Sequence, residues 1–580
     1  MENTHSAEVV IIGAGIAGVS AALQLAKHAK VTLIDKQHIF SGSSRNNPGR
    51  MGHGFHYIDF ETARMYLHAS IAVQRNYPDF LIGKNLPLQH PIRRGRYYIT
   101  TNSIFSCAQI MRTYVQLQQE YQRLVADDPA NEVFGSPEQF MKILSPEDYQ
   151  DFVNAELVVG AVETAEHLFN WPEFVIYIRR IIAEHANIIL LEDTEVIEIK
   201  PRHVLDSRFT IMTKTTSDGT ARACNTNFIV NSTWENIDYL NETACSRYIN
   251  RMRTNRLKCF LEVRLPESLV NFNSAFFCMG PFCMFANIGD GRAMLTLADV
   301  TNMACSHALR IDKDMARYLA GNVSLEEKLD IAHEILAGVG KYIPDIINAK
   351  FIDVKFGIVQ TQGELNLSDL LDPSAAHHIR NYHGIREEYQ GLISNPAMKL
   401  FYFVENGRQV EQFYLKQLRR EQIHQEVYNI LMRSHRYCWN KIFRNDNKKA
   451  LYLMIDRMML EETEDPNDVA RAMSIAIENK LNFHSYISAI RSSSKIILEM
   501  FEFVDIEYKR VDDGLVSKPI EVNTPENKHA NKYSIFRSHS FSSGLEKFMR
   551  PPTLYSPSLQ TDYSGCKGCY LDDLFTPCAP

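Results

Sequence analysis

The clearest pattern of apolar and polar positions lies at the start of the chain. Four apolar residues at Val9–Ile12 are followed without a break by the glycine-rich turn Gly13–Gly18. The apolar periodicity then becomes helical over Ile16–His28, and a second apolar run at Val31–Ile34 ends at the carboxylate of Asp35. Short, uninterrupted apolar runs of this kind are typical of buried parallel strands. The pattern therefore predicts a strand, a helix and a second strand within one parallel sheet.

The spacing of the glycines indicates what this unit binds. Gly13 permits a tight turn, Gly15 lets a pyrophosphate approach the backbone, and Gly18 lets the helix pack closely on the strand. The helix begins at Ile16 and Ala17 with unpaired amides and the positive end of its dipole, which favour phosphate. The acidic residue that ends the second strand lies about twenty residues beyond the turn, where it can accept hydrogen bonds from ribose hydroxyls. The motif predicts dinucleotide binding but does not separate FAD from NAD, because both carry an adenosine diphosphate half.

Later segments alternate between helical and strand patterns. Amphipathic helices are predicted over 61–81, 104–126 and 171–185, and Ser145-Pro146-Glu147-Asp148 is typical of another helix start. Residues 259–300 change character, with strand-like runs separated by proline and glycine turns. This second region predicts an antiparallel sheet, inserted between parts of the nucleotide-binding domain.

The C-terminal part of the chain extends beyond this pattern. Residues 407–505 are helical in periodicity almost throughout, which predicts an added module for dimerisation, partner binding or capping of the cofactor domain. From about Lys509 the chain is rich in Ser, Pro, Asn and Lys with few apolar clusters, which predicts a disordered tail.

Composition narrows the class of protein. A chain of 580 residues, 45% hydrophobic and 23% charged, is long enough to bury a large core and to form more than one domain. A net charge of −7 argues against nucleic acid as the main partner, since phosphate contacts need a concentrated basic surface. No apolar stretch reaches the length of a membrane span, and the N-terminus leads directly into the first strand, so neither a transmembrane helix nor a signal peptide is expected.

The cysteines point to a reducing compartment. Eleven cysteines are an odd number scattered along a long chain, which disfavours a disulfide framework and favours the cytoplasm, although an export signal at the C-terminus would leave no cleavable segment. Cys566 and Cys569 form a CxxC, with Cys578 beyond it. A zinc site needs a fourth ligand, and a thioredoxin-like pair needs a strand and helix around it. Neither context is visible, so no metal is predicted.

The segment that follows the second strand carries the most specific resemblance. Ser41–Tyr57 reads SGSSRNNPGRMGHGFHY and combines small residues with two arginines and two histidines. It resembles the flavin-contacting loop of the D-amino acid oxidase-like FAD-dependent oxidoreductases, a superfamily that includes glycine oxidase and sarcosine oxidase. The resemblance implies that the dinucleotide is FAD.

Three later segments extend the resemblance to about residue 418. Residues 187–200 look like the family's returning strands, in which Val196 would hold the adenosine through its backbone. Phe228–Asn236 resembles the family's VVNAAG strand and turn but lacks its glycine. Tyr382–Arg386 and Asn395–Leu400 resemble the segment that returns under the flavin, where Met398 and Lys399 would act through backbone amides or the lysine charge.

The predicted fold class is α/β, with a Rossmann-type FAD-binding domain, an inserted antiparallel-sheet substrate domain, a C-terminal helical module and a disordered tail. The FAD-binding parts are about 8–60, 160–240 and 350–418, the substrate-domain parts are about 61–159 and 241–349, the helical module is 419–505, and the tail is 506–580. The candidate cofactor-binding residues are Gly13, Gly15, Ile16, Ala17, Gly18, Asp35, Lys36, Ser43, Ser44, Asn46, Gly49, Arg50, Met51, Val196, Asn395, Met398 and Lys399.

An oxidase of this type depends mainly on positioning, because a deprotonated amine can pass a hydride to flavin if its carbon is held close and water is excluded. Arg50 could hold a substrate carboxylate in a forked pair, or could bind the cofactor phosphate. His53 and His56 could accept a proton from the amine, and Tyr57 lies beside them, although a histidine here could also bind a backbone carbonyl and the tyrosine could be core. Arg386 is a further candidate, because the family often places a substrate-binding arginine near this strand.

The resemblance implies oxidation of a C–N bond of an amine or amino acid, with a small molecule as the expected partner. Two alternatives stay open: oxidation of a C–O bond in a 2-hydroxy acid, and a flavin-binding regulatory or interaction protein without turnover. The added helical module and the missing glycine in Phe228–Asn236 favour the second alternative more than an ordinary oxidase would.

Overall fold

The computed structural model describes residues 4–204, 207–245, 253–433, 455, 465–471, 473 and 474. The chain divides into two units, of which the first contains Met1–Gln422 and the second contains most of the remainder. Every predicted site residue lies in the first unit. The predicted tail, including Cys566 and Cys569, falls outside the described residues, as does most of the predicted helical module.

A six-stranded sheet forms the nucleotide-binding part, in the order β18-β19-β11-β2-β3-β7. Its strands are β2 (Val9–Ile12), β3 (Val31–Ile34), β7 (Ile188–Leu191), β11 (Phe228–Asn231), β18 (Arg386–Tyr389) and β19 (Leu392–Ser394). All neighbours are parallel except β18 and β19. Every residue of β2 is buried, which confirms the strand predicted from the first apolar run.

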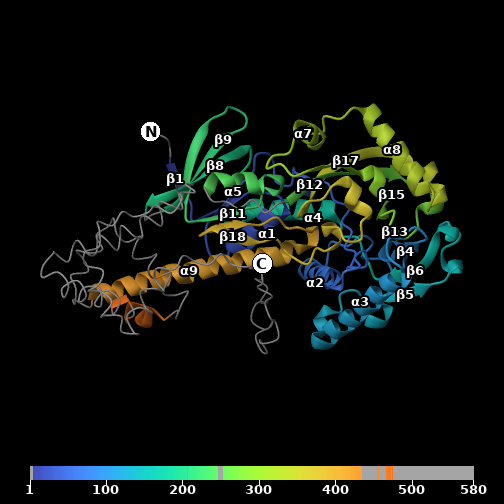
Figure 1. The fold of residues 1–580 in the computed structure, drawn as a ribbon, viewed down its shortest axis with the longest axis horizontal. Helices are drawn as coiled ribbons and strands as arrows, with labels where there is room; N and C mark the ends of the chain where they lie inside the picture. The colour runs from blue at the N-terminus through green and yellow to red at the C-terminus, as the bar shows by residue number, and fades with distance from the viewer. Residues whose placement is uncertain are drawn as a thin grey trace, which may run out of the picture. The chain divides into compact units, whose positions relative to one another are not determined.

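The helix predicted after the glycine turn is α1 (Ile16–Leu25). A small sheet in the order β1-β10-β9-β8 adjoins this part, and Figure 1 shows α5 (Ile237–Ala244) beside β8. The strands of the small sheet are β1 (Thr4–Ser6), β8 (Thr194–Val204), β9 (Ser207–Thr215) and β10 (Ala221–Thr226). The returning strands predicted over 187–200 are therefore β7 and the first part of β8.

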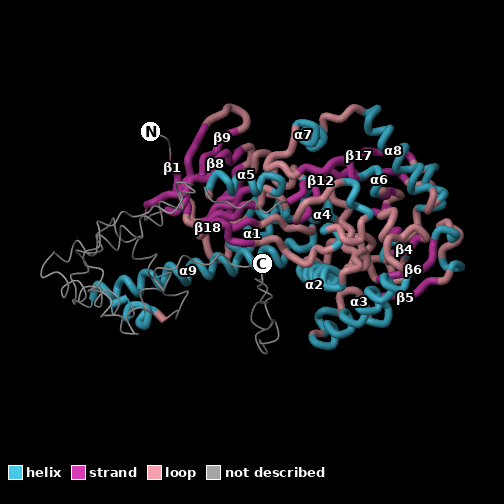
Figure 2. Tube along the Cα trace, viewed as in Figure 1, coloured by secondary structure: helices cyan, strands magenta, loops and turns pink. Residues whose placement is uncertain are grey.

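The second large sheet has nine strands, drawn in magenta with all other strands in Figure 2. Its order is β16-β12-β15-β14-β13-β4-β6-β5, with β17 also paired to β12. Its strands are β4 (Gly95–Thr100), β5 (Met141–Leu144), β6 (Val158–Thr164), β12 (Arg253–Arg264), β13 (Ser274–Cys278), β14 (Cys283–Gly289), β15 (Arg292–Thr296), β16 (Asn302–Ser306) and β17 (Lys350–Gln362). The prediction of an antiparallel sheet is confirmed with one exception, because β13 and β4 run parallel.

Two predicted boundaries of the FAD-binding part need correction. β17 pairs with β12 over its whole length, so 350–362 belongs to the substrate sheet and not to the FAD-binding part. β6 belongs there too, because it pairs with β4 and β5. The predicted junction at residue 419 falls inside α9 (Phe403–Arg433), a continuous helix that begins in the FAD-binding part.

The predicted helices on the surface of these sheets are present. They are α2 (Phe60–Asn76), α3 (Cys107–Asp127) and α4 (Trp171–Glu184), and later segments add α6 (Ala298–Thr301), α7 (Lys313–Leu319) and α8 (Leu325–Gly340). Asp59 caps α2 and Ser106 forms a capping box with Gln109 at α3, so local sequence fixes both starts. The predicted start at Ser145 gives only a short 3₁₀ turn, Pro146–Asp148. Among the described residues, no helix has the length and apolarity that a membrane crossing requires.

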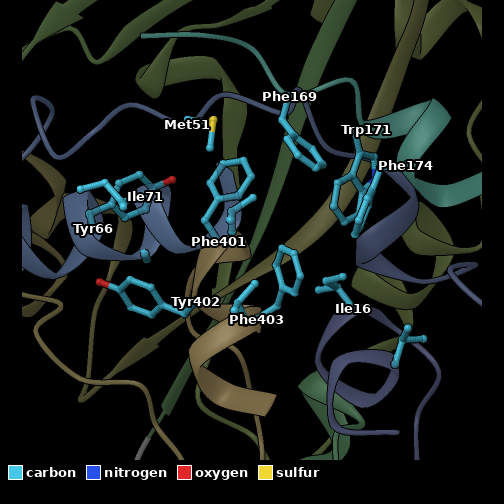
Figure 3. Close-up of a cluster of buried hydrophobic side chains, with 14 of the residues drawn as sticks. Ile16, Met51, Tyr66, Ile71, Phe169, Trp171, Phe174, Phe401, Tyr402 and Phe403 are labelled. Carbon is cyan, nitrogen blue, oxygen red and sulfur yellow. The ribbon is translucent and has the colours of Figure 1, made fainter. Parts of the chain in front are cut away.

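An aromatic cluster joins α2, α4 and the start of α9 (Figure 3). Phe401 packs edge-on against Phe169 at 5.9 Å between ring centroids, and Phe403 lies 5.8 Å from Phe174. These rings are buried and contribute most of the apolar contact at this junction. Their packing holds the segment just before them, residues 396–400, against the sheets.

Candidate active site

A cavity of about 580 Å³ lies at the carboxyl ends of β2 and β3 and at the start of α1. Ligands of open parallel sheets bind at this edge. Twelve of the seventeen predicted cofactor-binding residues line it: Gly13, Gly15, Ile16, Ala17, Asp35, Lys36, Ser43, Ser44, Arg50, Val196, Met398 and Lys399. We call it the cofactor cavity.

The glycine turn has the geometry that the sequence predicted. Gly13 has φ +95°, and a Cβ there would lie 2.6 Å from the carbonyl oxygen of Ser232. A Cβ on Gly18 would lie 1.8 Å from the carbonyl oxygen of Gly13, so α1 can pack this closely only without a side chain. A Cβ on Gly15 would project toward Ser44 Oγ at 3.0 Å, on the cavity side of the turn. The three glycines therefore serve the turn, the helix packing and the cavity, respectively.

The Ser41–Tyr57 loop is fastened to both domains. Ser44 Oγ accepts a hydrogen bond from the amide of Ile16 at 3.0 Å, and Ser43 Oγ accepts one from the amide of Ile358 at 3.1 Å. Asn46 donates to the carbonyl of Phe356 at 3.0 Å. The loop thus joins the N-terminus of α1 to β17 of the substrate sheet, and Ser43 and Ser44 form part of the cavity wall.

Carboxylates from the end of β3 and from the turn after β11 line the cofactor cavity. Asp35 accepts hydrogen bonds from the amides of Ala14 at 2.7 Å and Gln37 at 2.9 Å, which orient its side chain at the cavity. Glu235, which the sequence did not single out, also lines the cavity, 3.9 Å from the Lys36 ammonium. Burial raises the pKa of Glu235, opposed by Lys36. Both carboxylates are placed to accept hydrogen bonds from sugar hydroxyls.

These residues fit FAD. The glycine cradle leaves space where a side chain would otherwise stand, the first residues of α1 line the cavity, and acidic residues lie beside β3 and β11. Ser232, Thr233 and Trp234, which stand in place of the family's glycine-containing turn, all line the wall. The indole of Trp234 also reaches β17, donating to the carbonyl of Ile358 at 2.9 Å.

A second cavity of about 380 Å³ adjoins the first. The two share Ser43, Asn47, Pro48, Ile358, Val359, Arg380 and Lys399 as wall residues. His56, Tyr57 and Asn46 line the second cavity from the Ser41–Tyr57 loop, and Arg256 and Lys258 line it from β12. No carboxylate is among its described wall residues. We call it the substrate cavity.

His56 and Tyr57 stand together in this wall with their rings 4.0 Å apart. Burial lowers the pKa of His56 well below its usual value, and the charges of Lys399, Arg50 and Arg380 lower it further. The imidazole is therefore neutral at pH 7. Burial raises the pKa of Tyr57, whose hydroxyl has no hydrogen-bond partner among the described residues. Each can exchange a hydrogen bond with a ligand.

Four cationic side chains surround the same space. Arg380 is held in place by its amide, which donates to Thr62 Oγ1 at 2.9 Å, and by its guanidinium, which donates to Thr361 Oγ1 at 2.7 Å. The Lys399 ammonium lies over the Tyr57 ring, 4.9 Å from its centroid. Arg256 completes the group with Lys258, two residues along β12.

Several predicted site residues lie elsewhere or are already engaged. Arg50 reaches the cofactor cavity, but its guanidinium forms a buried double hydrogen bond with Glu166 and lies over the rings of Tyr97 and Phe276. Burial acts to lower the pKa of Arg50, but the Glu166 carboxylate outweighs it and the pKa is raised. This arginine is therefore not available as a forked clamp for a substrate carboxylate.

His53 and Arg386 line neither cavity. His53 has φ +42° and turns into the core, where its ring lies 3.9 Å from that of Phe134 and its Nε2 lies 3.1 Å from the carbonyl of Ala165. Burial lowers its pKa to about 4. Arg386 pairs with Glu388 at 2.6 Å on β18. The expectation that either residue meets a substrate is therefore not supported, and Arg380 is the arginine of this segment that reaches the cavity.

Four predicted cofactor residues act through packing. Gly18 and Gly49 have no room for a side chain, since a Cβ on Gly49 would lie 2.1 Å from the carbonyl of Phe169. Met51 is fully buried in the core (Figure 3). Asn395 donates to the carbonyl of Ala17 at 3.0 Å and so ties the end of β19 to α1. None of the four lines either cavity.

Sequence reasoning missed Arg256, Lys258 and Arg380. A signal was present in β12, where Arg256 and Lys258 alternate with the core residues Leu257 and Cys259. Charged residues at alternate positions of a long, otherwise buried strand indicate a lined cavity. In the described part of the chain, no group of three or more His, Cys, Asp or Glu residues is placed to hold a metal ion.

Comparison with known proteins gives one family match. Residues 8–256 match the family model described as DAO, FAD dependent oxidoreductase. No curated protein sequence matches the chain significantly.

Solved structures show similar folds at low identity. L-proline dehydrogenase from P. horikoshii is 16% identical, with 71% of this chain and 94% of that chain covered and a TM-score of 0.49. Glycine oxidase from Geobacillus kaustophilus is 16% identical, with 72% and 95% covered and a TM-score of 0.47. L-α-glycerophosphate oxidase from Mycoplasma pneumoniae, solved with FAD bound, is 16% identical, with 70% and 94% covered and a TM-score of 0.48.

Proposed function

We propose that this chain, an enzyme whose residues 8–256 are an FAD-dependent oxidoreductase domain of the DAO family, oxidises a C–N bond of an amine or amino acid. The observation that carries the proposal is the substrate cavity, which shares a wall with the cofactor cavity and joins a neutral histidine to a cluster of cations. The cofactor is FAD, which when bound accepts a hydride and passes two electrons to an acceptor.

The cationic wall favours an amine substrate in its reactive form. Arg256, Arg380 and the two lysines attract a carboxylate and at the same time disfavour an ammonium, so they lower the pKa of a bound amine. A neutral amine can give up the hydride of its α-carbon without a strong base. Loss of the hydride leaves an iminium ion, which water hydrolyses to a carbonyl compound and an ammonium ion or a smaller protonated amine.

Different residues of the cavity would orient the substrate, exchange hydrogen bonds with it and exclude water. Arg380 stands on the shared wall and would orient the substrate carboxylate toward the cofactor. Neutral His56 would accept a hydrogen bond from the amine, and the Tyr57 hydroxyl would donate one to the substrate. Apolar wall residues Phe260, Phe276 and Met284 would exclude water from the reacting carbon.

The histidines of this cavity give no support to C–O oxidation. A 2-hydroxy acid must lose a proton from a hydroxyl, which is a much weaker acid than an ammonium. The described histidines of the wall are poor bases, because burial lowers the pKa of His56, His377 and His378. C–O oxidation would therefore have to use a lysine of the wall as its base, such as Lys258, whose pKa is lowered to about 7, whereas a neutral amine needs no such base.

A product assay tests the proposal. The purified yellow protein would be given amino acids, N-methyl amino acids, polyamines and 2-hydroxy acids with an artificial electron acceptor. Acceptor reduction with release of ammonia or amine in equal amount supports C–N oxidation. Acceptor reduction by 2-hydroxy acids alone would overturn it in favour of C–O oxidation, and no reduction by any compound would favour a binding protein without turnover.

A cytoplasmic location belongs to the same proposal. The cysteines of the described residues are all free thiols, as a reducing compartment requires. Cell fractionation with an antibody to the native chain would test it.

A further inference from the structure

The substrate cavity contains more positive charge than one carboxylate can neutralise. Arg256 and Arg380 are 6% and 2% exposed, and the Nε of each has no hydrogen-bond partner among the described residues. Lys258 and Lys399 are partly buried in the same wall. In the described part of the chain, none of the four pairs with an Asp or Glu side chain within salt-bridge distance.

The four cations act on one another. Burial, helped by the charges of Arg256 and Arg380, lowers the pKa of Lys258 to about 7. Burial also lowers the pKa of Lys399 well below its usual value, helped by Arg380, Arg256 and Lys258. The groups therefore lie close enough to repel, and among the described residues no acidic side chain pairs with them to offset this cost.

The two arginines set the smallest number of acidic groups that a ligand needs in order to neutralise the cavity. Arginine stays protonated in proteins, so Arg256 and Arg380 together hold two positive charges even where both lysines are neutral. One carboxylate would leave at least one buried guanidinium unpaired, and an unpaired buried charge costs far more than a paired one. Two acidic groups would satisfy both arginines and restore the charge of the lysines.

We propose that the substrate cavity recognises an amine that carries two acidic groups, one a carboxylate and the other a second carboxylate or a phosphate. The proposal rests on the C–N oxidation proposed above and specifies its substrate class. Arg380 and Lys399, on the wall shared with the cofactor cavity, hold the acidic group nearer the reacting carbon. Arg256 and Lys258, on one face of β12, hold the other.

The shape of the wall agrees with such a ligand. Phe260, Phe276, Met279 and Phe282 line the same cavity as the cations, so a short methylene chain between the acidic groups has apolar contacts. A volume of about 380 Å³ is within the lower range of small-molecule sites. Asn302 lines the wall with its Oδ1 unpaired among the described residues, and is placed to accept a hydrogen bond from a protonated acidic group or an amine.

The test measures binding and needs no turnover. Calorimetry on the purified holoprotein would compare the dicarboxylates malonate, succinate and glutarate with acetate and butyrate, and with inorganic phosphate and phosphoglycolate. Arg256→Gln and Lys258→Met would be measured beside Arg264→Gln, which removes an exposed arginine of the same strand that lines neither cavity. Flavin absorbance would report whether each variant retains its cofactor and fold.

The expected result is at least tenfold tighter binding of one dianionic series than of the monocarboxylates. Arg256→Gln should weaken that dianion about thirtyfold or more, as for loss of one partner from a desolvated charge pair. Arg264→Gln should leave it unchanged. Preference for dicarboxylates or for phosphoglycolate identifies the second acidic group.

Two outcomes would overturn the proposal: equal affinity for monoanions and dianions, or unchanged dianion affinity in both Arg256→Gln and Lys258→Met. Should one variant lose its flavin, the other decides. Failure of the proposed function looks different, because dianions would then still bind and depend on Arg256 while no amine with acidic groups reduces the acceptor.

Discussion

Gly15 offers the sharpest perturbation of the cofactor cavity, because its side chain is absent where a ligand phosphate must approach. Its φ of −75° is ordinary for any residue, so a substitution brings no backbone strain. A Cβ would lie 3.0 Å from Ser44 Oγ, a side-chain atom that can move by a few tenths of an ångström. Gly15→Val adds two further methyl groups, which must point into the cavity or into Ser44.

The expected loss of FAD affinity follows from this crowding. Overfilling a packed site costs about 1 to 3 kcal/mol, and in this variant the cost falls on the bound state, since the cavity has room before FAD enters. About 2 kcal/mol corresponds to a roughly thirtyfold increase in the dissociation constant of FAD. Gly15→Ala adds only one carbon atom, so its dissociation constant for FAD should lie between those of the wild type and Gly15→Val.

The assay is the ratio of flavin to protein after gel filtration, followed by titration of the apoprotein with FAD. Gly18→Ala is the comparison, because its Cβ would lie 1.8 Å from a backbone oxygen that cannot move cheaply. Gly18→Ala should therefore lower the free energy of unfolding by about 3 kcal/mol or more, whereas Gly15→Val should leave the apoprotein nearly as stable as wild type.

The reasoning fails if Gly15→Val retains stoichiometric FAD with an unchanged dissociation constant. That result would place the pyrophosphate away from the turn, whatever the family of the domain. Equal loss of stability in Gly15→Val and Gly18→Ala would also contradict it, because the two glycines would then serve the same packing role.

Three further predictions concern charge. Asp35→Asn should weaken FAD binding about tenfold or more without unfolding the protein, since hydrogen bonds to a charged group contribute about 1.5 to 3 kcal/mol, and an unchanged affinity in an FAD titration would assign the ribose to Glu235. Glu166→Gln should lower the free energy of unfolding by about 3 to 5 kcal/mol in urea, because it leaves the buried Arg50 guanidinium without its counter-charge, and a loss below about 1 kcal/mol would refute that role. Dianion affinity should be greatest below pH 7 and fall as the pH rises above it, because the pKa of Lys258 is lowered to about 7 in the ligand-free protein and a bound anion raises it. Calorimetry in two buffers should show proton uptake on binding at about pH 8, and proton release would contradict the sign.

The nucleotide-binding part could be predicted because its turn and strands depend on residues that are close together in the sequence. The turn from Gly13 to Gly18 needs particular residues for its own geometry, and the strands on either side are uniformly apolar and buried. Asp35 follows from the length of the unit alone. These features depend on neighbours in sequence, so a single sequence contains them.

The substrate cavity depends on contacts that no local pattern reveals. Arg256 and Lys258 meet Arg380 and Lys399 only because β12 and the segment before α9 are brought together over more than a hundred residues. His53 and His56 lie three residues apart in one loop, yet His53, with a positive φ, turns into the core against Phe134. Tertiary packing therefore decides which of the two histidines faces the cavity.

The same dependence on tertiary contacts explains why the sequence pointed to Arg386, whereas the cavity contains Arg380. Arg386 stands on β18 and pairs through its Nε with Glu388 two residues away, while its buried Nη2 has no hydrogen-bond partner among the described residues. Arg380 has its backbone held by Thr62 of α2 and its side chain by Thr361 of β17. Only the folded chain shows which of the two is left to face a ligand.

The most direct measurement is an anaerobic absorbance scan of the purified holoprotein, with amino acids that carry one or two acidic groups added in turn. The account predicts that the flavin band bleaches with amines, fastest with those that have two acidic groups, and that 2-hydroxy acids leave it oxidised. A flavin band that amines leave unchanged while 2-hydroxy acids bleach it would contradict the proposed chemistry, and a colourless protein that does not take up FAD would contradict the cofactor site itself.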